Sequence, residues 1–289
     1  MKRIFVILAV CTVLGSCAEN VEKLAGRHLD NAKEAFSMGN YNIAKQEIDS
    51  IKILYPKAFE TRRQGIKLMQ KIEETEQLRA IQYEDSMIAV SQAAFDRIKA
   101  DYAFEKDEQY QDIGLYTIKS QAPQRNTDRT YIRAQVDELG HMTLISSYRG
   151  SSYIHHDWLK LSVGELYVDT PESKDRHEFT DLGICYERLS FINGNDGGAA
   201  AFISANKDQN ITYTLYRKTG PESSRAVYKN LKMTKDDRYA IAQLYDLSQV
   251  LLSLNEHKSL RDEADRHLKF IRSKMKEDVS AEQAVQEDK

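Results

Sequence analysis

YIRAQVDELGHMTLISSY, residues 131–148, contains two runs of alternating apolar and polar residues on either side of a turn at Gly140. In a β-strand successive side chains point to opposite faces, so each run presents one apolar face. The stretch therefore predicts an antiparallel hairpin whose buried side chains are Ile132, Ala134, Val136, Met142 and Leu144.

Further runs with the same period follow, separated by turns rich in glycine, asparagine and aspartate. They predict strands over residues 159–163, 166–168, 184–192, 199–205, 211–217 and 226–233. Roughly seven or eight strands in about 110 residues, joined by short turns, are typical of an antiparallel sandwich or small barrel. Residues 107–233 are therefore expected to form an antiparallel β domain.

A long helix is expected on each side of this β domain. Between Lys57 and about Lys106 only Gly65 disfavours a helix, which at 1.5 Å per residue would be roughly 75 Å long. Thr234 and Asp237 form a capping signal for a second helix, predicted over residues 234–277. Its apolar residues step by three and four as in a coiled-coil seam, so the two helices are expected to pair. The first half of the seam comprises Leu244, Leu247, Leu251 and Leu254. After a phase break, where Lys258, Arg261 and Asp265 occupy the original register, a second half follows with Ala264, Leu268, Ile271 and Met275.

Residues 21–56 are expected to form a helical hairpin that turns at a glycine and ends before a proline. Its spacing resembles the second half of a tetratricopeptide repeat, and the matching residues are Gly39, Tyr41, Ala44, Ile48, Ile51 and Pro56. The first half departs from the repeat, since Asn31 and Ala32 replace Leu-Gly and Ala35 replaces an aromatic residue. No second copy follows, so one hairpin is expected and not a peptide-binding superhelix.

Together these elements predict an α+β chain. An N-terminal helical hairpin and long helix within residues 17–106 precede the antiparallel β sandwich or small barrel, and the long C-terminal helix pairs with the first long helix. One arrangement is an antiparallel helical stalk that carries the β domain. The alternative is a compact body in which the helices pack broadside against the sheet. The polar tail, residues 278–289, is predicted to be disordered.

The first residues have the composition of a secretory signal. Lys2 and Arg3 precede an apolar run, Ile4 to Leu14, that is too short to span a bilayer. The following Leu14-Gly15-Ser16-Cys17 resembles a bacterial lipobox, which implies a signal peptide over residues 1–16 and a diacylglyceryl group on Cys17, as in palmitoylated lipoproteins. An uncleaved membrane helix is the alternative.

Composition excludes some classes of function and structure. Lysine and arginine total 41 against 44 aspartate and glutamate residues, a net charge of -3, so no basic surface for nucleic acid is expected. Cleavage before Cys17 would leave Cys185 as the one unmodified thiol, so packing and not a disulfide must stabilise the chain. Cys185 lies in a predicted strand and is expected to be buried and inert.

His155-His156-Asp157 is the one compact group of acid–base or metal-ligand residues. Adjacent histidines in an extended chain point to opposite faces, so they could share an ion only through a turn. The sequence contains no His-Glu-x-x-His, Cys-x-x-Cys or Gly-x-Ser-x-Gly motif. We therefore expect a polar loop here, with no catalytic residue, metal ligand or cofactor; a hydrolase that uses these residues is the weakest hypothesis.

Aromatic residues suggest a possible ligand surface. Tyr148, Tyr153 and Trp158 gather around one turn, and aromatic faces stack on sugars. These residues are therefore the candidate ligand-binding residues for an envelope glycan. The alternative is that tyrosine and tryptophan simply favour strands.

Taken whole, the layout resembles uncharacterised envelope lipoproteins of Bacteroidetes, which implies no catalytic residues. We expect a non-enzymatic protein, lipid-anchored in the cell envelope, on the outer membrane and facing the periplasm. Its expected role is scaffolding or protein interaction, with a protein partner or a second copy of the chain. A glycan-binding module is the alternative function.

Overall fold

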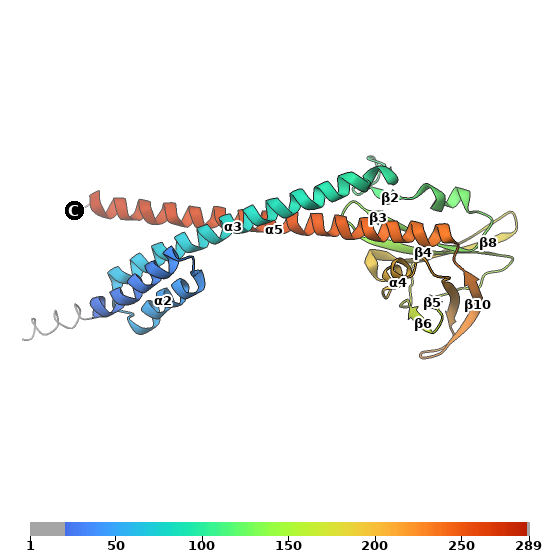
Figure 1. Ribbon diagram of the computed structural model, residues 1–289, viewed down its shortest axis with the longest axis horizontal. Helices are drawn as coiled ribbons and strands as arrows, with labels where there is room; N and C mark the ends of the chain where they lie inside the picture. The colour runs from blue at the N-terminus through green and yellow to red at the C-terminus, as the bar shows by residue number, and fades with distance from the viewer. Residues whose placement is uncertain (1–20, 288–289) are drawn as a thin grey trace, which may run out of the picture. The chain divides into compact units, whose positions relative to one another are not determined.

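The computed structural model describes residues 21–287, so the predicted signal peptide and Cys17 lie outside the described residues (Figure 1). Helices and two antiparallel sheets confirm the predicted α+β fold. The chain divides into two compact units: a helical unit, Met1–Asp85 with Ser259–Lys289, and a β unit, Ser86–Lys258. The long helices α3 (Phe59–Ile98) and α5 (Lys235–Glu287) contribute residues to both units.

The helical unit begins with the predicted hairpin. Its first helix is described over residues 21–37 and is followed by α2 (Tyr41–Leu54) and the start of α3. Gly39 turns the chain with a φ of 77°, a conformation that glycine adopts without steric cost. Fully buried alanines, which let helices approach closely, are Ala25, Ala32, Ala44 and Ala58.

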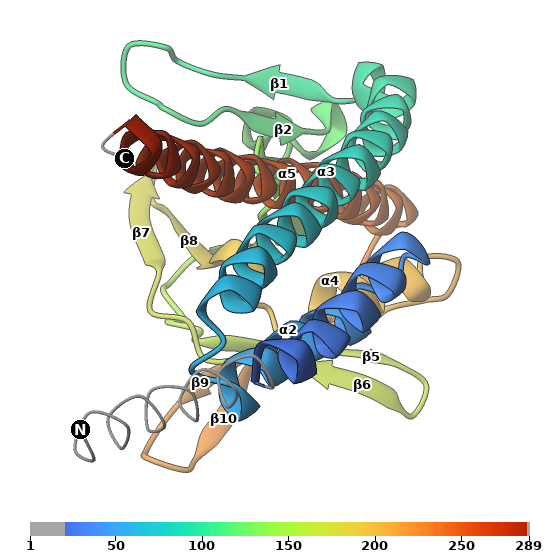
Figure 2. The ribbon, with the colours of Figure 1, turned by 90° about the vertical axis from the view of Figure 1, so that its left-hand side faces the viewer.

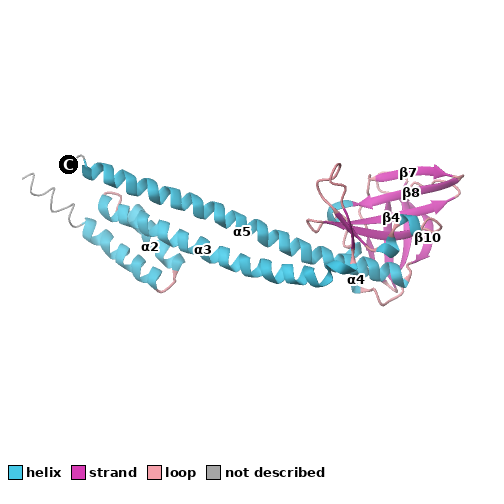
Figure 3. Cartoon of the chain, turned by 90° about the horizontal axis from the view of Figure 1, so that it is seen from above, coloured by secondary structure: helices cyan, strands magenta, loops and turns pink. Residues whose placement is uncertain are grey.

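Within the helical unit, α3 and α5 are paired as predicted (Figure 3). Gln70 Nε2 of α3 donates to Asp278 Oδ2 of α5 over 2.6 Å, and Arg272 Nε of α5 donates to Glu74 over 2.8 Å. Buried apolar residues of the second half of the predicted seam are Ala264, Leu268 and Ile271.

The predicted disordered tail is wrong, because α5 continues to Glu287. The segment after Asp278 contains Ala281, Gln283 and neighbouring glutamate residues, which favour helices, and it lacks glycine and proline. The polarity of this segment was therefore not sufficient evidence for disorder.

The β unit contains two sheets in which all neighbouring strands are antiparallel. Strands of both sheets are visible in Figure 2. The six-stranded sheet has the order β1-β2-β3-β4-β8-β7, and the four-stranded sheet has the order β10-β9-β5-β6. Their bounds are β1 (Ala103–Glu105), β2 (Leu115–Thr117), β3 (Tyr131–Asp137), β4 (Met142–Gly150), β5 (Trp158–Val163), β6 (Leu166–Asp169), β7 (Arg176–Asp181), β8 (Ile184–Phe191), β9 (Thr212–Lys218) and β10 (Ser224–Lys232). Short 3₁₀ turns cover Lys99–Asp101, Lys119–Gln121, Pro123–Arg125 and Ile192–Gly194.

One apolar core joins both sheets and the start of α5. Leu144 of β4, Leu159 of β5 and Leu215 of β9 are each 1 % exposed or less and belong to this core. Leu244, Leu247 and Leu251 belong to the same core. The first half of the predicted seam therefore packs into the core of the β unit, where Phe95 and Ile98 of α3 also contact that core.

Two predicted boundaries differ from the structure. α3 ends at Ile98, not near Lys106, and β1 begins at Ala103, before the predicted start of the β domain at residue 107. A 3₁₀ turn at Lys99–Asp101 separates them, and such tight turns are frequent at helix ends.

Residues Ala199–Ala205 form helix α4, so the strand predicted there is wrong. Asp196 accepts the backbone N–H groups of Gly198 and Ala200, both over 2.8 Å, and so satisfies donors at the start of the helix. The run of alanines also favours a helix. The glycine-rich turn before α4 was predicted to connect two strands. In the structure it connects a strand to this helix.

Candidate functional site

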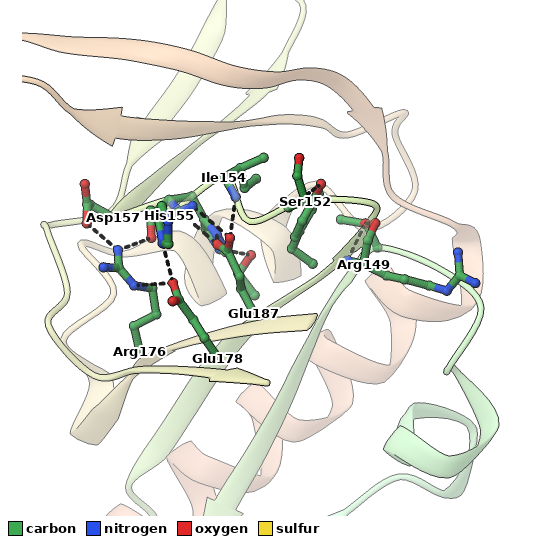
Figure 4. Close-up of polar contacts among 12 residues, drawn as sticks. Arg149, Ser152, Ile154, His155, Asp157, Arg176, Glu178 and Glu187 are labelled. Atoms are coloured by element: carbon green, nitrogen blue, oxygen red, sulfur yellow. Dashed lines mark hydrogen bonds and ion pairs between the residues drawn. The ribbon is translucent and has the colours of Figure 1, made fainter. Parts of the chain in front are cut away.

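Glu187 of β8 is the centre of a buried polar network (Figure 4). Its side chain is 0 % exposed and accepts the backbone N–H groups of Ile154, His155 and His156. The Nδ1 atom of His156 lies 2.8 Å from Glu187 Oε2, and because a carboxylate only accepts, this nitrogen donates. The network therefore fixes the loop between β4 and β5 on the six-stranded sheet.

The surroundings of Glu187 shift its pKa in opposite directions. Burial would raise the pKa, because it disfavours the charged form. Hydrogen bonds from the His156 side chain and from the His155 and Ile154 backbone favour the carboxylate, and the net pKa lies below its usual value. Glu187 is therefore held as a buried carboxylate at neutral pH.

His156 also links Glu187 to Ser146 of β4. The Nε2 atom of His156 lies 3.0 Å from Ser146 Oγ, so hydroxyl, imidazole and carboxylate follow one another as in a hydrolase triad. All three residues are 0 % exposed. A substrate has no access to the Ser146 hydroxyl, and this trio holds strands and loop together.

The outer part of the network involves Arg176 of β7. Its guanidinium lies 2.9 Å from both Asp157 Oδ1 and Glu178 Oε1, and Figure 4 shows it between these two carboxylates. His155 Nδ1 contacts the same Glu178 oxygen over 2.8 Å. The exposed edge of the site is therefore a compact ion-pair cluster.

His155, Glu178 and Glu187 form a candidate cation site, since their ligand atoms lie within 4.8 Å of one another. The two oxygens of Glu187 already accept four N–H hydrogen bonds, which use the acceptor positions of a carboxylate. Glu178 is neutralised by Arg176. These three side chains therefore do not form a suitable site for a cation.

The structure separates the predicted residues of the His155-His156-Asp157 group. Residues 153–157 form the loop expected before Trp158. His155 has a φ of 53°, so the chain turns at this residue and the two histidines do not lie in an extended segment. His156 faces the buried carboxylate, whereas His155 and Asp157 join the Arg176 cluster. Sequence reasoning missed Ser146, Arg176, Glu178 and Glu187, because strand pairing brings them here from distant segments.

The three candidate aromatic residues have different neighbours. Tyr148 is 6 % exposed and packs edge-on against Tyr228 in the core region. Tyr153 stacks on the ring of His155. Trp158 stacks on Tyr216 instead, with ring centroids 3.9 Å apart. The turn therefore does not assemble them into one stacked aromatic group.

Concave surfaces also lie apart from this network within the described residues. A hollow of about 340 Å³ in the β unit is bordered by Trp158 and polar side chains. A groove of about 330 Å³ in the helical unit lies between α2 and α3 and has mostly apolar walls.

Comparisons with protein families, curated proteins and solved structures found no match. Among the described residues, no helix combines the length and the apolar composition needed to cross a membrane.

Proposed function

We propose that this chain is a non-enzymatic scaffold protein of the bacterial cell envelope, anchored by lipid on Cys17, whose helical unit binds a second copy of the chain. The observation that carries the assembly role is the apolar groove between α2 and α3. The lipobox resemblance supports lipid anchoring in the envelope, and the proposal places the chain on the outer membrane, facing the periplasm.

The groove has an apolar floor and an exposed apolar wall. Ile48 and Ile51 of α2 are buried along the floor, whereas Ile66 of α3 is 54 % exposed. Gly65 adds no side chain between them, so the floor stays open. Elsewhere in the helical unit, Ile53, Leu54 and Phe59 are also exposed but do not border the groove. A surface of this kind is stabilised when another apolar surface covers it.

The charges that border the groove favour a second copy as its occupant. Asp49 and Lys52 lie one helical turn apart on α2, and Arg62 and Glu73 border the groove from α3. The rim thus carries equal numbers of positive and negative groups and attracts no strongly charged ligand. A two-fold axis that passes between Asp49 and Lys52 would place each Asp49 beside the other copy's Lys52, so the surface can be self-complementary.

Anchoring would strengthen this association. Only Ala18, Glu19 and Asn20 separate Cys17 from Val21, the first described helical residue. Chains held on one membrane surface meet at a higher effective concentration than free chains. A weak groove contact would therefore suffice for assembly in the envelope.

Replacement of Cys17 by alanine should release the chain from the membrane fraction, because the lipid chains and their buried methylene groups are lost. Fractionation of cells followed by immunodetection measures this. A Ser16→Ala variant keeps the cysteine and serves as the control. Retention of the Cys17→Ala chain in membranes would contradict lipid anchoring.

The Ile66→Cys variant should form a covalent dimer when intact cells are treated with a short bismaleimide cross-linker. The reaction is selective, because Cys185 is buried and Cys17 is lipidated under the proposal. The product is measured as a band of twice the chain mass. Val90→Cys places a thiol at a 63 % exposed position of the same helix and serves as the control.

Exclusively monomeric Ile66→Cys protein would contradict assembly through the groove. A product with a different protein would assign the groove to that protein and overturn the second copy as its occupant. Equal dimer yields from Ile66→Cys and Val90→Cys would also overturn it, because they indicate random collision.

A further inference from the structure

The four-stranded sheet has one buried and one accessible face. Leu159 and Leu161 of β5 are 0 % exposed, whereas the alternating residues Trp158 and Lys160 are partly exposed. Trp158 pairs across the strands with Tyr216 of β9, so both rings lie on the accessible face.

Trp158 is held in a fixed orientation on this face. Tyr216 stacks on the indole with an angle of 7° between the ring planes. The indole Nε1 donates to Ser224 Oγ of β10 over 3.1 Å. These contacts hold the ring before a ligand arrives, which lowers the entropy cost of binding.

The ring borders the hollow of about 340 Å³, whose other walls come from the end of β6 and the β9–β10 turn. These walls are mainly charged groups and hydroxyls. They comprise Asp169, Thr170, Glu172, Lys218, Glu222 and Ser223. An aromatic surface beside several hydrogen-bonding side chains suits a ligand with one apolar face and many polar groups at its edge.

The polar groups are placed to bind at the edge of such a ligand. Lys218 Nζ pairs with Glu172 Oε2 over 2.5 Å, whereas Asp169 is exposed at the end of β6. Carboxylates accept hydrogen bonds from hydroxyl groups, and the lysine ammonium donates to hydroxyl or ring oxygens. Both kinds of partner that a sugar ring needs are therefore present.

We propose that this hollow binds a neutral pyranose residue of a glycan, with the ring against Trp158 and its hydroxyl groups on Asp169, Glu172 and Lys218. This site goes beyond assembly through the helical unit and uses none of its residues. Asp169, Glu172 and Glu222 face a single lysine, Lys218, so the hollow carries negative charge and disfavours acidic sugars. Of the three aromatic residues singled out from the sequence, only Trp158 borders this hollow.

The full chain is titrated by calorimetry with neutral oligosaccharides of glucose, galactose, mannose and N-acetylglucosamine. Trp158 is the sole tryptophan, so its fluorescence reports the same event independently. At least one neutral oligosaccharide should bind saturably and change this fluorescence. An oligogalacturonate, which differs from the galactose oligomer by its carboxylates, should bind more weakly.

Trp158→Ala and Asp169→Asn should each weaken calorimetric binding by about tenfold, as expected from lost ring contact or a lost charged hydrogen bond. Asp169 is exposed, so Asp169→Asn tests the site without a change in the core. Phe179→Ala removes a ring that stacks on Tyr186 of the other sheet and should leave affinity unchanged. The proposal is overturned if no neutral oligosaccharide binds at millimolar concentration, or if affinity is the same in both site variants as in the wild type.

Discussion

Replacement of Glu187 by alanine is expected to lower the free energy of unfolding of the β unit by about 3–5 kcal/mol. The substitution leaves the backbone N–H groups of Ile154, His155 and His156 and the His156 ring without their buried acceptor. Denaturant unfolding followed by Trp158 fluorescence measures the effect in the β unit, since this unit contains the sole tryptophan. Glu178→Ala is the matched control: its side chain is 25 % exposed, and a loss of about 1 kcal/mol or less is expected.

The Glu187 contribution should also depend on pH. Its pKa is lowered in the folded chain, so the folded state binds fewer protons than the unfolded state between the two pKa values. Its stabilisation is therefore present above the unfolded pKa of about 4.3 and is lost as the pH falls through the folded value. The stability difference between wild type and Glu187→Gln should shrink on acidification. A difference that stays constant down to pH 2 would contradict this assignment.

Asp237→Ala is expected to lower the free energy of unfolding of the β unit by about 3 kcal/mol. This value is at the lower end of the range for breaking a buried ion pair, because Arg129 is 30 % exposed. Arg129 binds both oxygens of Asp237, over 2.6 and 2.7 Å, and Gln121 Nε2 donates to one of them over 2.7 Å. The pair ties the segment before β3 to the start of α5. Unfolding followed by Trp158 fluorescence again measures the change.

The neighbouring Asp236 provides the control for this prediction. It is exposed in the same first turn of α5, so Asp236→Ala removes an equal charge without breaking the buried pair. Burial alone would raise the pKa of Asp237. Hydrogen bonds with Arg129, Gln121 and Thr234 lower the pKa by more than burial raises it, so the net pKa lies below the usual value of an aspartate. Its contribution is therefore also lost as the pH falls through the folded pKa. Equal losses from both alanine variants would contradict a special role for Asp237.

The sequence predicted the strands whose side chains alternate clearly. β5, β8 and β9 alternate between buried and less buried residues, whereas β3 and β4 bury residues on both faces over part of their length. In all five strands the alternating apolar residues of the sequence revealed the strand. β7 (Arg176–Asp181) was missed because it is a polar, mostly exposed strand at the edge of its sheet. The error at α4 arose because a short apolar run fits a strand or a helix equally well.

The candidate sites were less predictable, since they depend on pairing between distant strands. Trp158 was identified as one of three aromatic residues around a turn, but its neighbours Asp169 and Lys218 come from the ends of β6 and β9. Glu187 meets His156 only because the loop after β4 folds back over β8. No local motif marks such contacts, so spacing along the sequence could not reveal them.

Assembly through the helical unit is tested most directly by exchange of charges on α2. Dimer formation is measured by cross-linking of Ile66→Cys in intact cells, with Asp49→Lys, Lys52→Asp or both added. Each single change places like charges together across the two-fold axis and should reduce the dimer yield, whereas the double change restores opposite charges and should restore it. A double variant that dimerises no better than the single variants would contradict a two-fold contact through this groove.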